Sequence, residues 1–398
     1  MPRTLTRRDF LRDAVAASAA GVALPLAARA TAAADEYDIL LLGDVHYDKL
    51  AHHDMTWLER EKAGDVRQVQ NYSRLTAEVW PRTLERIRAA VAAPGGVGGP
   101  VAFVAHIGDF VEGLCGTPAL AELQNREAIA SVTDARLGAP FLFCKGNHDI
   151  TGPGAPDAFD RVLLPFITAQ AEGGRPKLTC FDVERANLAV SHGNDWFLFF
   201  DAYDPRALEW LERVLGKRTA RHVFVLVHPP VVPYGARSTW TVLAGAARLP
   251  RRQRLLDLLG EHRAFVLTGH IHKYALATRV TERGPFVQLA ISSVISKPDV
   301  AASLMLSGID DYTPDQISVE PSFSPDTEAE RRAVLAAEAP HVQAFEYGDV
   351  PGYARISIGS TVRVGVYAGL AEQEWRGLHL SRLRDTTRRA VALAAESP

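Results

Sequence analysis

The chain contains 398 residues, of which 47% are hydrophobic and 23% are charged, a composition typical of a globular protein with a large core. Its formal net charge of −3 argues against a nucleic acid as the main partner, because proteins that bind nucleic acids usually carry an excess of Lys and Arg. Beyond residue 34, no segment is apolar over enough residues to span a bilayer. The three cysteines, Cys115, Cys144 and Cys180, cannot all pair, and no disulfide framework is predicted.

The first 34 residues are predicted to be an export signal rather than part of the fold. Arg7 and Arg8 precede a small, apolar run over 14–28, and small-x-small cleavage sites follow. This order resembles a twin-arginine signal, which the export machinery recognises; an uncleaved N-terminal helix is the alternative. We therefore expect a bacterial or archaeal protein that is exported to the periplasm or the outside. Removal of residues 1–34 would leave a net charge of −6.

From Tyr37 onward, strand-like and helix-like runs alternate, which indicates an α/β fold. Between them, the polar, histidine-rich stretch 47–73 is expected to be a solvated loop that contains His52 and His53. The predicted strands are 39–42, 101–107, 141–144, three short strands within 178–201, 222–227, 264–268, 275–281, 286–291, 354–358 and 362–367. The predicted helices are 77–92, 119–133, 205–215, 251–261 and 327–338.

Five short fragments end in side chains that bind metals, and most of them follow an apolar, strand-like run. Because ligands at the ends of adjacent buried strands converge on one edge of a sheet, we expect these side chains to form a single site. The fragments are Gly43-Asp44-Val45-His46, Gly108-Asp109, Gly146-Asn147-His148-Asp149, His228 before two prolines, and Gly269-His270-Ile271-His272.

The spacing of these donors suits a centre with two metal ions. Asp44 and His46 lie two residues apart and can coordinate one ion, and the same holds for His270 and His272. The two carboxylate oxygens of Asp109 can bridge two ions. Two cations about 3.5–4 Å apart lower the pKa of a water between them and neutralise a phosphoryl centre. Nitrogen and oxygen donors without a thiolate suit Mn, Fe, Zn or Co. Each fragment alone is weak evidence, and the ordered set is the stronger signal.

The ordered set resembles the calcineurin-like metallophosphoesterase superfamily over residues 37 to 291. The resemblance implies a four-layer α/β/β/α sandwich of two mixed sheets, with two divalent or transition metal ions at the carboxyl ends of the strands. It assigns one ion to Asp44, His46, Asp109 and His272, and the other to Asp109, Asn147, His228 and His270.

The same resemblance gives roles to three further residues. His148 matches the histidine that contacts the phosphate and protonates the leaving oxygen, and Glu112 stands where relatives often carry an Asp that orients it. Asp149 is expected to steady the motif, because ligand histidines usually donate their second N–H to such a carboxylate. Gly113 replaces the Arg of protein Ser/Thr phosphatases, and Glu112 replaces the iron-binding Tyr of purple acid phosphatases.

The implied activity is that of a di-metal phosphohydrolase, in which a metal-bridged hydroxide attacks phosphorus in a small-molecule phosphate ester. A phosphodiesterase or a broad phosphomonoesterase is favoured; a nucleotidase or nuclease of the same fold and a non-catalytic binding scaffold are the alternatives. The residues expected to contact the substrate are Arg74, Tyr234 and Arg237.

Two units are expected beyond the export signal. Residues 35–300 would form the catalytic domain, and residues 301–398 would form a C-terminal extension that packs on it, because no long linker separates them. The closing strands of this extension are expected to join a second sheet.

Overall fold

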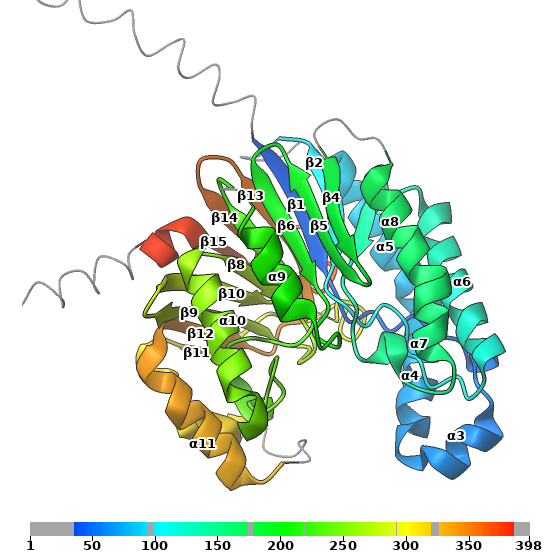
Figure 1. The fold of residues 1–398 in the computed structure, drawn as a ribbon. Coiled ribbons are helices and arrows are strands. Elements are labelled where there is room, and N and C mark those ends of the chain that lie inside the picture. Colours follow the sequence, from blue (N-terminus) through cyan, green and yellow to red (C-terminus); the bar gives the residue numbers. More distant parts are fainter. Residues whose placement is uncertain are drawn as a thin grey trace, which may run out of the picture.

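Two mixed β-sheets pack face to face, and helices cover the outer face of each (Figure 1). The computed structural model describes residues 36–93, 99–173, 178–217, 220–291, 293–319 and 326–385, so the expected export signal lies outside the described residues. The predicted four-layer α/β/β/α sandwich is confirmed. Within these described ranges, no helix combines the length and the apolar character needed to cross a membrane.

The first sheet has six strands in the order β15-β14-β13-β1-β2-β3. Strands β1, β2 and β3 run parallel, and β13 pairs with β1 in the antiparallel sense. Their bounds are β1 Tyr37–Leu42, β2 Val101–His106, β3 Phe141–Phe143, β13 Gly352–Ile358, β14 Val362–Ala368 and β15 Arg376–His379.

The second sheet has nine strands in the order β11-β12-β9-β10-β8-β7-β6-β5-β4. Its central strands β6, β7, β8 and β10 run parallel, and antiparallel hairpins extend it on both sides. Their bounds are β4 Leu178–Glu184, β5 Asn187–His192, β6 Asp195–Phe200, β7 Val223–Val227, β8 Phe265–Thr268, β9 Tyr274–Thr281, β10 Gly284–Ala290, β11 Leu304–Ser307 and β12 Val342–Gly348.

The helices lie on both sides of this sandwich: α5, α6 and α8 near the first sheet, and α9 and α10 on the second (Figure 1). A π-helical turn over Phe159–Leu163 joins α7 to α8. The bounds are α3 Met55–Glu61, α4 Val66–Glu78, α5 Trp80–Ala92, α6 Pro118–Ala135, α7 Ala155–Ala158, α8 Leu164–Glu172, α9 Ala207–Leu215, α10 Leu249–Glu261 and α11 Glu328–Glu338.

The stretch 47–73, expected to be a solvated loop, is instead mostly helical and partly buried. Asp54 caps α3 by accepting a hydrogen bond from the Trp57 amide, and α4 follows directly. His52 and His53 are both buried, and His53 Nε2 lies 2.7 Å from Asp48 Oδ1. The expectation was wrong because these polar side chains are satisfied by one another inside the fold, which a hydropathy pattern does not reveal.

The segments after residue 300 add strands to both sheets. β11 and β12 extend the second sheet beside β9, whereas β13, β14 and β15 extend the first sheet beside β1. The expectation that the closing strands join a second sheet was therefore wrong. Local sequence does not specify such a pairing, because it joins residues more than 300 positions apart.

A row of phenylalanines joins the two sheets. Phe103 of β2 meets Phe197 of β6 edge to face, with ring centroids 4.8 Å apart. Phe197 stacks on Phe224 of β7, and Phe224 stacks on Phe265 of β8, at 4.7 and 5.1 Å. All four side chains are fully buried, so the row holds the strands that carry the functional loops at a fixed spacing.

Replacing Phe224 by Ala should lower the free energy of unfolding by about 3–5 kcal/mol, because it removes the stacking on Phe197 and Phe265 and leaves a cavity between the sheets. Chemical denaturation measures the loss. Leu123→Ala, at an exposed position of α6, serves as the control and should stay within about 0.5 kcal/mol. A loss for Phe224→Ala as small as that of the control would contradict this account.

Candidate metal centre

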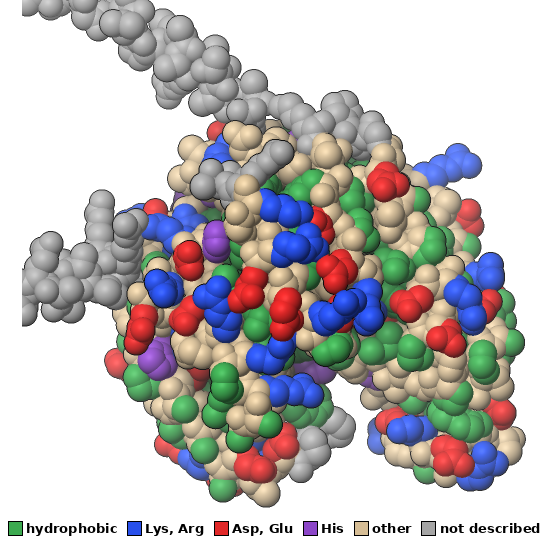
Figure 2. Space-filling view, viewed as in Figure 1, with side chains coloured by type: hydrophobic (Ala, Val, Ile, Leu, Met, Phe, Trp, Pro, Cys, Tyr) green, Lys and Arg blue, Asp and Glu red, His purple; other side chains and the backbone are tan. Residues whose placement is uncertain are grey.

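The donor fragments converge at the carboxyl ends of five parallel strands. Asp44 and His46 follow β1, Asp109 follows β2, and the remaining fragments follow β3, β7 and β8. In the space-filling view, a broad notch separates the part of the molecule with α3 and α4 from the part with α10 and α11 (Figure 2). Histidine side chains are visible at the inner end of this notch. The chain thus places its donors where α/β folds form their sites.

The candidate donor atoms lie close to one another. His228 Nε2 is 3.0 Å from Asp109 Oδ2, and His46 Nε2 is 3.8 Å from the same oxygen. Asp109 therefore lies between two sets of histidines. Three overlapping groups have ligand atoms within 4.8 Å of one another: Asp44 with His46 and His272, His46 with Asp109 and His148, and Asp109 with His228 and His270.

Five of these residues have a left-handed backbone, which is uncommon outside glycine. Their φ angles are 51° at Asp44, 46° at His46, 53° at Asp109, 72° at His270 and 60° at His272. Such a conformation costs about 1–3 kcal/mol per residue and persists only where the surroundings impose it. Asp44 and His46 belong to one donor group, whereas His270 and His272, also two residues apart, belong to two different groups.

Two glycines let the fragments approach one another at backbone distance. A Cβ atom on Gly269 would lie 2.4 Å from Asp44 Oδ2, and one on Gly146 would lie 2.1 Å from the Asp109 amide nitrogen. Only a residue without a Cβ fits at these two positions. The glycines that precede the donors in the sequence are thus required by contacts between different fragments.

The arrangement of the donor atoms is more favourable with a bound cation between them than with direct contacts between the imidazole nitrogens. His46 Nδ1 is held by a carboxylate, and His228 Nδ1 donates to the Ile107 carbonyl, so both Nε2 atoms carry lone pairs when the imidazoles are neutral. These lone pairs lie 3.2 Å from His272 Nε2 and 3.1 Å from His270 Nδ1. A cation would satisfy both pairs.

The pKa shifts of His46, His270 and Asp109 agree with this fit. Burial lowers the pKa of His46 and of His270 well below the ordinary value, which favours the neutral imidazole that binds metals. Burial opposes ionisation of Asp109, but His228 and His148 hold the pKa of its carboxyl well below the usual range. Within the described residues, the buried Asp44 Oδ2 has no hydrogen-bond partner. Burial opposes protonation of His228, but the neighbouring Asp109 raises the pKa of this imidazole to about 9, so a cation bound here would have to displace a proton from His228.

Asp149 holds the fragment after β2 against the fragment after β3. Its Oδ1 accepts hydrogen bonds from the Phe110 and Val111 amides, and its Oδ2 accepts from the Asp109 and Gly146 amides. The expected histidine partner is not among its hydrogen bonds to described residues. Asp149 instead fixes the main chain from which the Asp109 side chain projects.

The Glu112 carboxylate, expected to orient His148, lies closer to His46. Its Oε2 lies 2.7 Å from His46 Nδ1, and its Oε1 accepts a hydrogen bond from Gln68. His148 Nδ1 donates at 2.8 Å to the main-chain carbonyl of Glu112, while the carboxylate lies farther away, at 3.5 Å. The Glu112 carboxylate therefore orients a candidate metal ligand, because the longer side chain passes His148 and reaches His46.

The three predicted substrate contacts lie in different environments. Arg74 points to solvent on α4 and pairs with Glu78, and Tyr234 is buried in the core against the outer helices, so neither lines the centre. The Arg237 guanidinium lies 5.0 Å from the ring of Trp240, whose ring is 5.4 Å from that of His270. Arg237 alone among the three remains near the donors.

Two aromatic residues near the donors were not predicted as site residues. Tyr72 of α4 stacks on His46 with ring centroids 4.2 Å apart, and its hydroxyl lies 3.3 Å from His272 Nδ1. The Tyr203 hydroxyl lies 3.5 Å from Asn147 Oδ1. Tyr72 belongs to the apolar face of a helix with Val69, a periodicity that was hidden by the polar residues around it.

The chain belongs to the calcineurin-like phosphoesterase family, whose sequence pattern matches residues 37–274, more than half of the chain. With the donor groups described above, this membership makes it a metal-dependent phosphoric ester hydrolase that uses divalent metal ions. No curated protein shows significant sequence similarity to the chain.

Several solved structures are similar to this chain at low sequence identity. PhoD is 12% identical with a TM-score of 0.48, and the match covers 87% of this chain and 68% of PhoD. The purple acid phosphatase PPD1 from yellow lupin (Lupinus luteus) seeds is 10% identical, with a TM-score of 0.49 and coverage of 87% and 54%. A dimetal phosphatase from Danio rerio is 13% identical, with a TM-score of 0.45 and coverage of 87% and 98%.

Glu112→Gln should weaken metal binding about 10–100-fold, because the carboxamide holds the His46 imidazole less firmly than the carboxylate. Titration of the metal-free protein with Zn²⁺ or Mn²⁺, followed by calorimetry, measures the change. Glu59→Gln, at an exposed position of α3, is the matched control and should bind metal like the unaltered protein. Equal affinity of the two variants would remove the role of Glu112.

Proposed function

We propose that this chain is an exported di-metal phosphohydrolase that cleaves small phosphate esters, either as a phosphodiesterase or as a broad phosphomonoesterase. The observation that carries the proposal is the position of Asp109, which belongs to two donor groups and has a histidine on each side. A carboxylate in this position suits a bridge between two ions.

In this proposal, Asp44, His46, Asp109 and His272 hold one ion, and Asp109, Asn147, His228 and His270 hold the other. Divalent ions bound there supply an activated water and neutralise the charge on the phosphoryl oxygens. The nitrogen and oxygen donors suit Mn, Fe, Zn or Co. Asp149 and Glu112 position Asp109 and His46, respectively.

We assign to His148 the protonation of the leaving oxygen. Its side chain is 19% exposed, so it can reach a substrate in the notch, and its Nδ1 is held by the Glu112 carbonyl. The opposite nitrogen, Nε2, is then available to hand a proton to the substrate. Arg237 is retained as a contact to the substrate, beside Trp240.

A nuclease and a non-catalytic scaffold are less well supported than a hydrolase of small phosphate esters. A nuclease should present a basic groove, but on the face shown in Figure 2 positive and negative side chains alternate, and ion pairs such as Arg251 with Glu209 link α10 to α9. A non-catalytic scaffold would be expected to lack donors, and all seven are present in the sequence. A nucleotidase of the same fold is the remaining alternative.

We also propose that the chain is exported and that two units follow the export signal. Residues 1–34 would direct the chain to the periplasm or the outside through the export machinery, residues 35–300 would carry catalysis, and residues 301–398 would pack on the same domain. The pairing of β13 with β1 supports a tight association of the last part with the first.

The metal-loaded protein should hydrolyse p-nitrophenyl phosphate, bis-p-nitrophenyl phosphate, or both, and a chelator should abolish the activity. Asp109→Asn and His270→Ala should lose metal and activity together, because each removes a donor from a group of three. Absorbance assays with elemental analysis measure both quantities. Protein that holds metal but hydrolyses neither ester would overturn the proposal.

His148→Ala should retain its metal while kcat falls by about 10²–10⁴-fold, the usual contribution of a general acid. The loss should be smaller for an ester with a good leaving group, such as p-nitrophenolate, than for an alkyl ester that needs protonation. An equal loss on both esters, or an unchanged kcat, would remove the assigned role.

A further inference from the structure

Helix α4 turns a row of polar side chains toward the donor loops, and the functions proposed above give this row no role. Gln68, Tyr72 and Thr76 recur at intervals of four residues, so they lie on one face of the helix. Tyr72, Thr76 and the neighbouring Ser73 are buried. The helix borders the notch on the side opposite α10 (Figure 1). Buried polar groups need hydrogen-bond partners, and those of this row belong to the donor loops.

Tyr72 contacts a candidate ligand directly. His272 Nε2 lies 3.2 Å from His46 Nε2 and 3.3 Å from Asp44 Oδ1, so this nitrogen faces the other donors of its group. The second ring nitrogen of His272, Nδ1, lies 3.3 Å from the Tyr72 hydroxyl. A neutral imidazole whose Nε2 offers a lone pair carries its hydrogen on Nδ1, and the Tyr72 oxygen can accept it. Tyr72 therefore favours the tautomer and the ring orientation of His272 that suit an ion.

Gln68 reaches a second candidate ligand through Glu112. The Gln68 amide donates to Glu112 Oε1 at 2.8 Å, while Glu112 Oε2 lies 2.7 Å from His46 Nδ1. Glu112 is fully buried, so Gln68 holds the carboxylate oxygen that does not face His46. The Nδ1 atoms of both imidazoles are thus held from α4, one directly and one through a carboxylate.

Two further side chains join α4 to the loop after β1. Ser73 Oγ donates to Asp48 Oδ2 at 2.6 Å, and the Asp48 amide donates to Thr76 Oγ1 at 2.9 Å. Asp48 is fully buried and lies two residues after His46. These bonds therefore fix the distance between the helix and the loop that carries Asp44 and His46.

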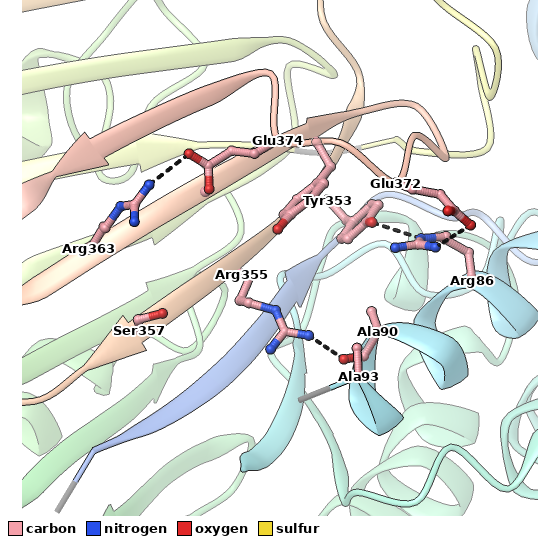
Figure 3. A pocket seen from close by; sticks show the side chains of 11 residues that line it. Arg86, Ala90, Ala93, Tyr353, Arg355, Ser357, Arg363, Glu372 and Glu374 are labelled. Carbon is pink, nitrogen blue, oxygen red and sulfur yellow. Dashed lines mark hydrogen bonds and ion pairs between the residues drawn. The ribbon is translucent and has the colours of Figure 1, made fainter. Parts of the chain in front are cut away.

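Helix α5, which follows α4 directly in the chain, is fastened to the first sheet. Figure 3 shows these contacts in a pocket of about 220 Å³. Arg86 Nε of α5 donates to the Tyr353 hydroxyl at 2.9 Å, and Arg355 donates to the Ala90 carbonyl of α5. Tyr353 and Arg355 belong to β13, the strand that pairs with β1. The helix pair is thus held against the sheet from which the first donors project.

The other donor group is held in a different way. His228 Nδ1 donates to the main-chain carbonyl of Ile107 at 2.7 Å. The ring of His270 lies 5.4 Å from that of Trp240, in the loop before α10. Within the described ranges, none of the hydrogen bonds made by the polar row of α4 reaches His228, His270 or Asn147. The polar row therefore supports one group of donors and not the other.

We propose that α4 orients the donors of the first ion through Tyr72 and Gln68, so that this ion depends on the helix and the second ion does not. The inference rests on the proposed function, which assigns one ion to each donor group. Tyr72 and Gln68 are positioning residues, because they act through the ligand imidazoles and do not themselves hold the ion. Loss of such a supporting contact typically weakens metal binding about 10–100-fold.

Calorimetric titration of the metal-free full chain with Mn²⁺ or Zn²⁺ tests the proposal. The unaltered protein should bind two ions. Tyr72→Phe and Gln68→Ala should each weaken one ion about tenfold or more and leave the other unchanged. His272→Ala removes a donor of the first group alone, so it identifies the binding step that belongs to the first ion. Equal weakening of both ions, or no change in either variant, would overturn the role of α4.

Two matched controls accompany these variants. Gln70→Ala changes the same residue type on the exposed face of α4, and Tyr203→Phe removes a hydroxyl that lies near Asn147 of the other group. Both should bind the first ion like the unaltered protein. Equal unfolding midpoints of the metal-free proteins would show that all variants are folded. A loss of the first ion in Gln70→Ala as large as in Gln68→Ala would refute the specific role of Gln68.

The visible absorption of bound Co²⁺ provides a readout that does not depend on turnover. Tyr72→Phe should change the absorption of the first Co²⁺ alone, because the hydroxyl no longer orients the His272 imidazole. An unaltered protein that binds a single ion would contradict the two-ion proposal. The role of α4 would then stand if Tyr72→Phe weakens that ion, and it would fall if Tyr72→Phe leaves that ion unchanged.

Discussion

The hydrogen bonds of one buried carboxylate support the rest of the centre. Asp149 accepts four main-chain N–H groups, three from the turn after β2 and one from Gly146 after β3. These bonds join two loops that belong to different strands and set the direction of the Asp109 side chain. Since Asp109 lies within reach of the histidines from both sheets, the arrangement of the whole donor set depends on this link.

The sandwich brings together groups that would otherwise repel or destabilise one another. Left-handed backbone at five donors, imidazole nitrogens about 3 Å apart and an unpaired buried oxygen are unfavourable by themselves. The rigid sheets and the phenylalanine row between them supply the stability that offsets these costs. Cations bound to the donors would remove much of the remaining imbalance, which couples metal binding to folding stability.

The loop before α10 borders both the metal centre and a cavity that lies between α10 and α11. Trp240 contacts His270 and is followed and preceded by residues that line the cavity. The centre gathers carboxylates and imidazoles, whereas the cavity holds two guanidinium groups among three carboxylates.

The sequence alone predicted the alternation of strands and helices and the seven candidate donors, because strand-like runs and the short fragments that follow them are local patterns, whereas the sandwich was implied by the resemblance to a known family. It did not determine which partners these residues meet. The Glu112 carboxylate lies closer to His46 than to His148, Tyr234 lies in the core, and Tyr72 covers the donors from a helix expected to be a loop. These outcomes, like the pairing of β13 with β1, depend on contacts between residues far apart in the chain, which only the packing of the two sheets decides.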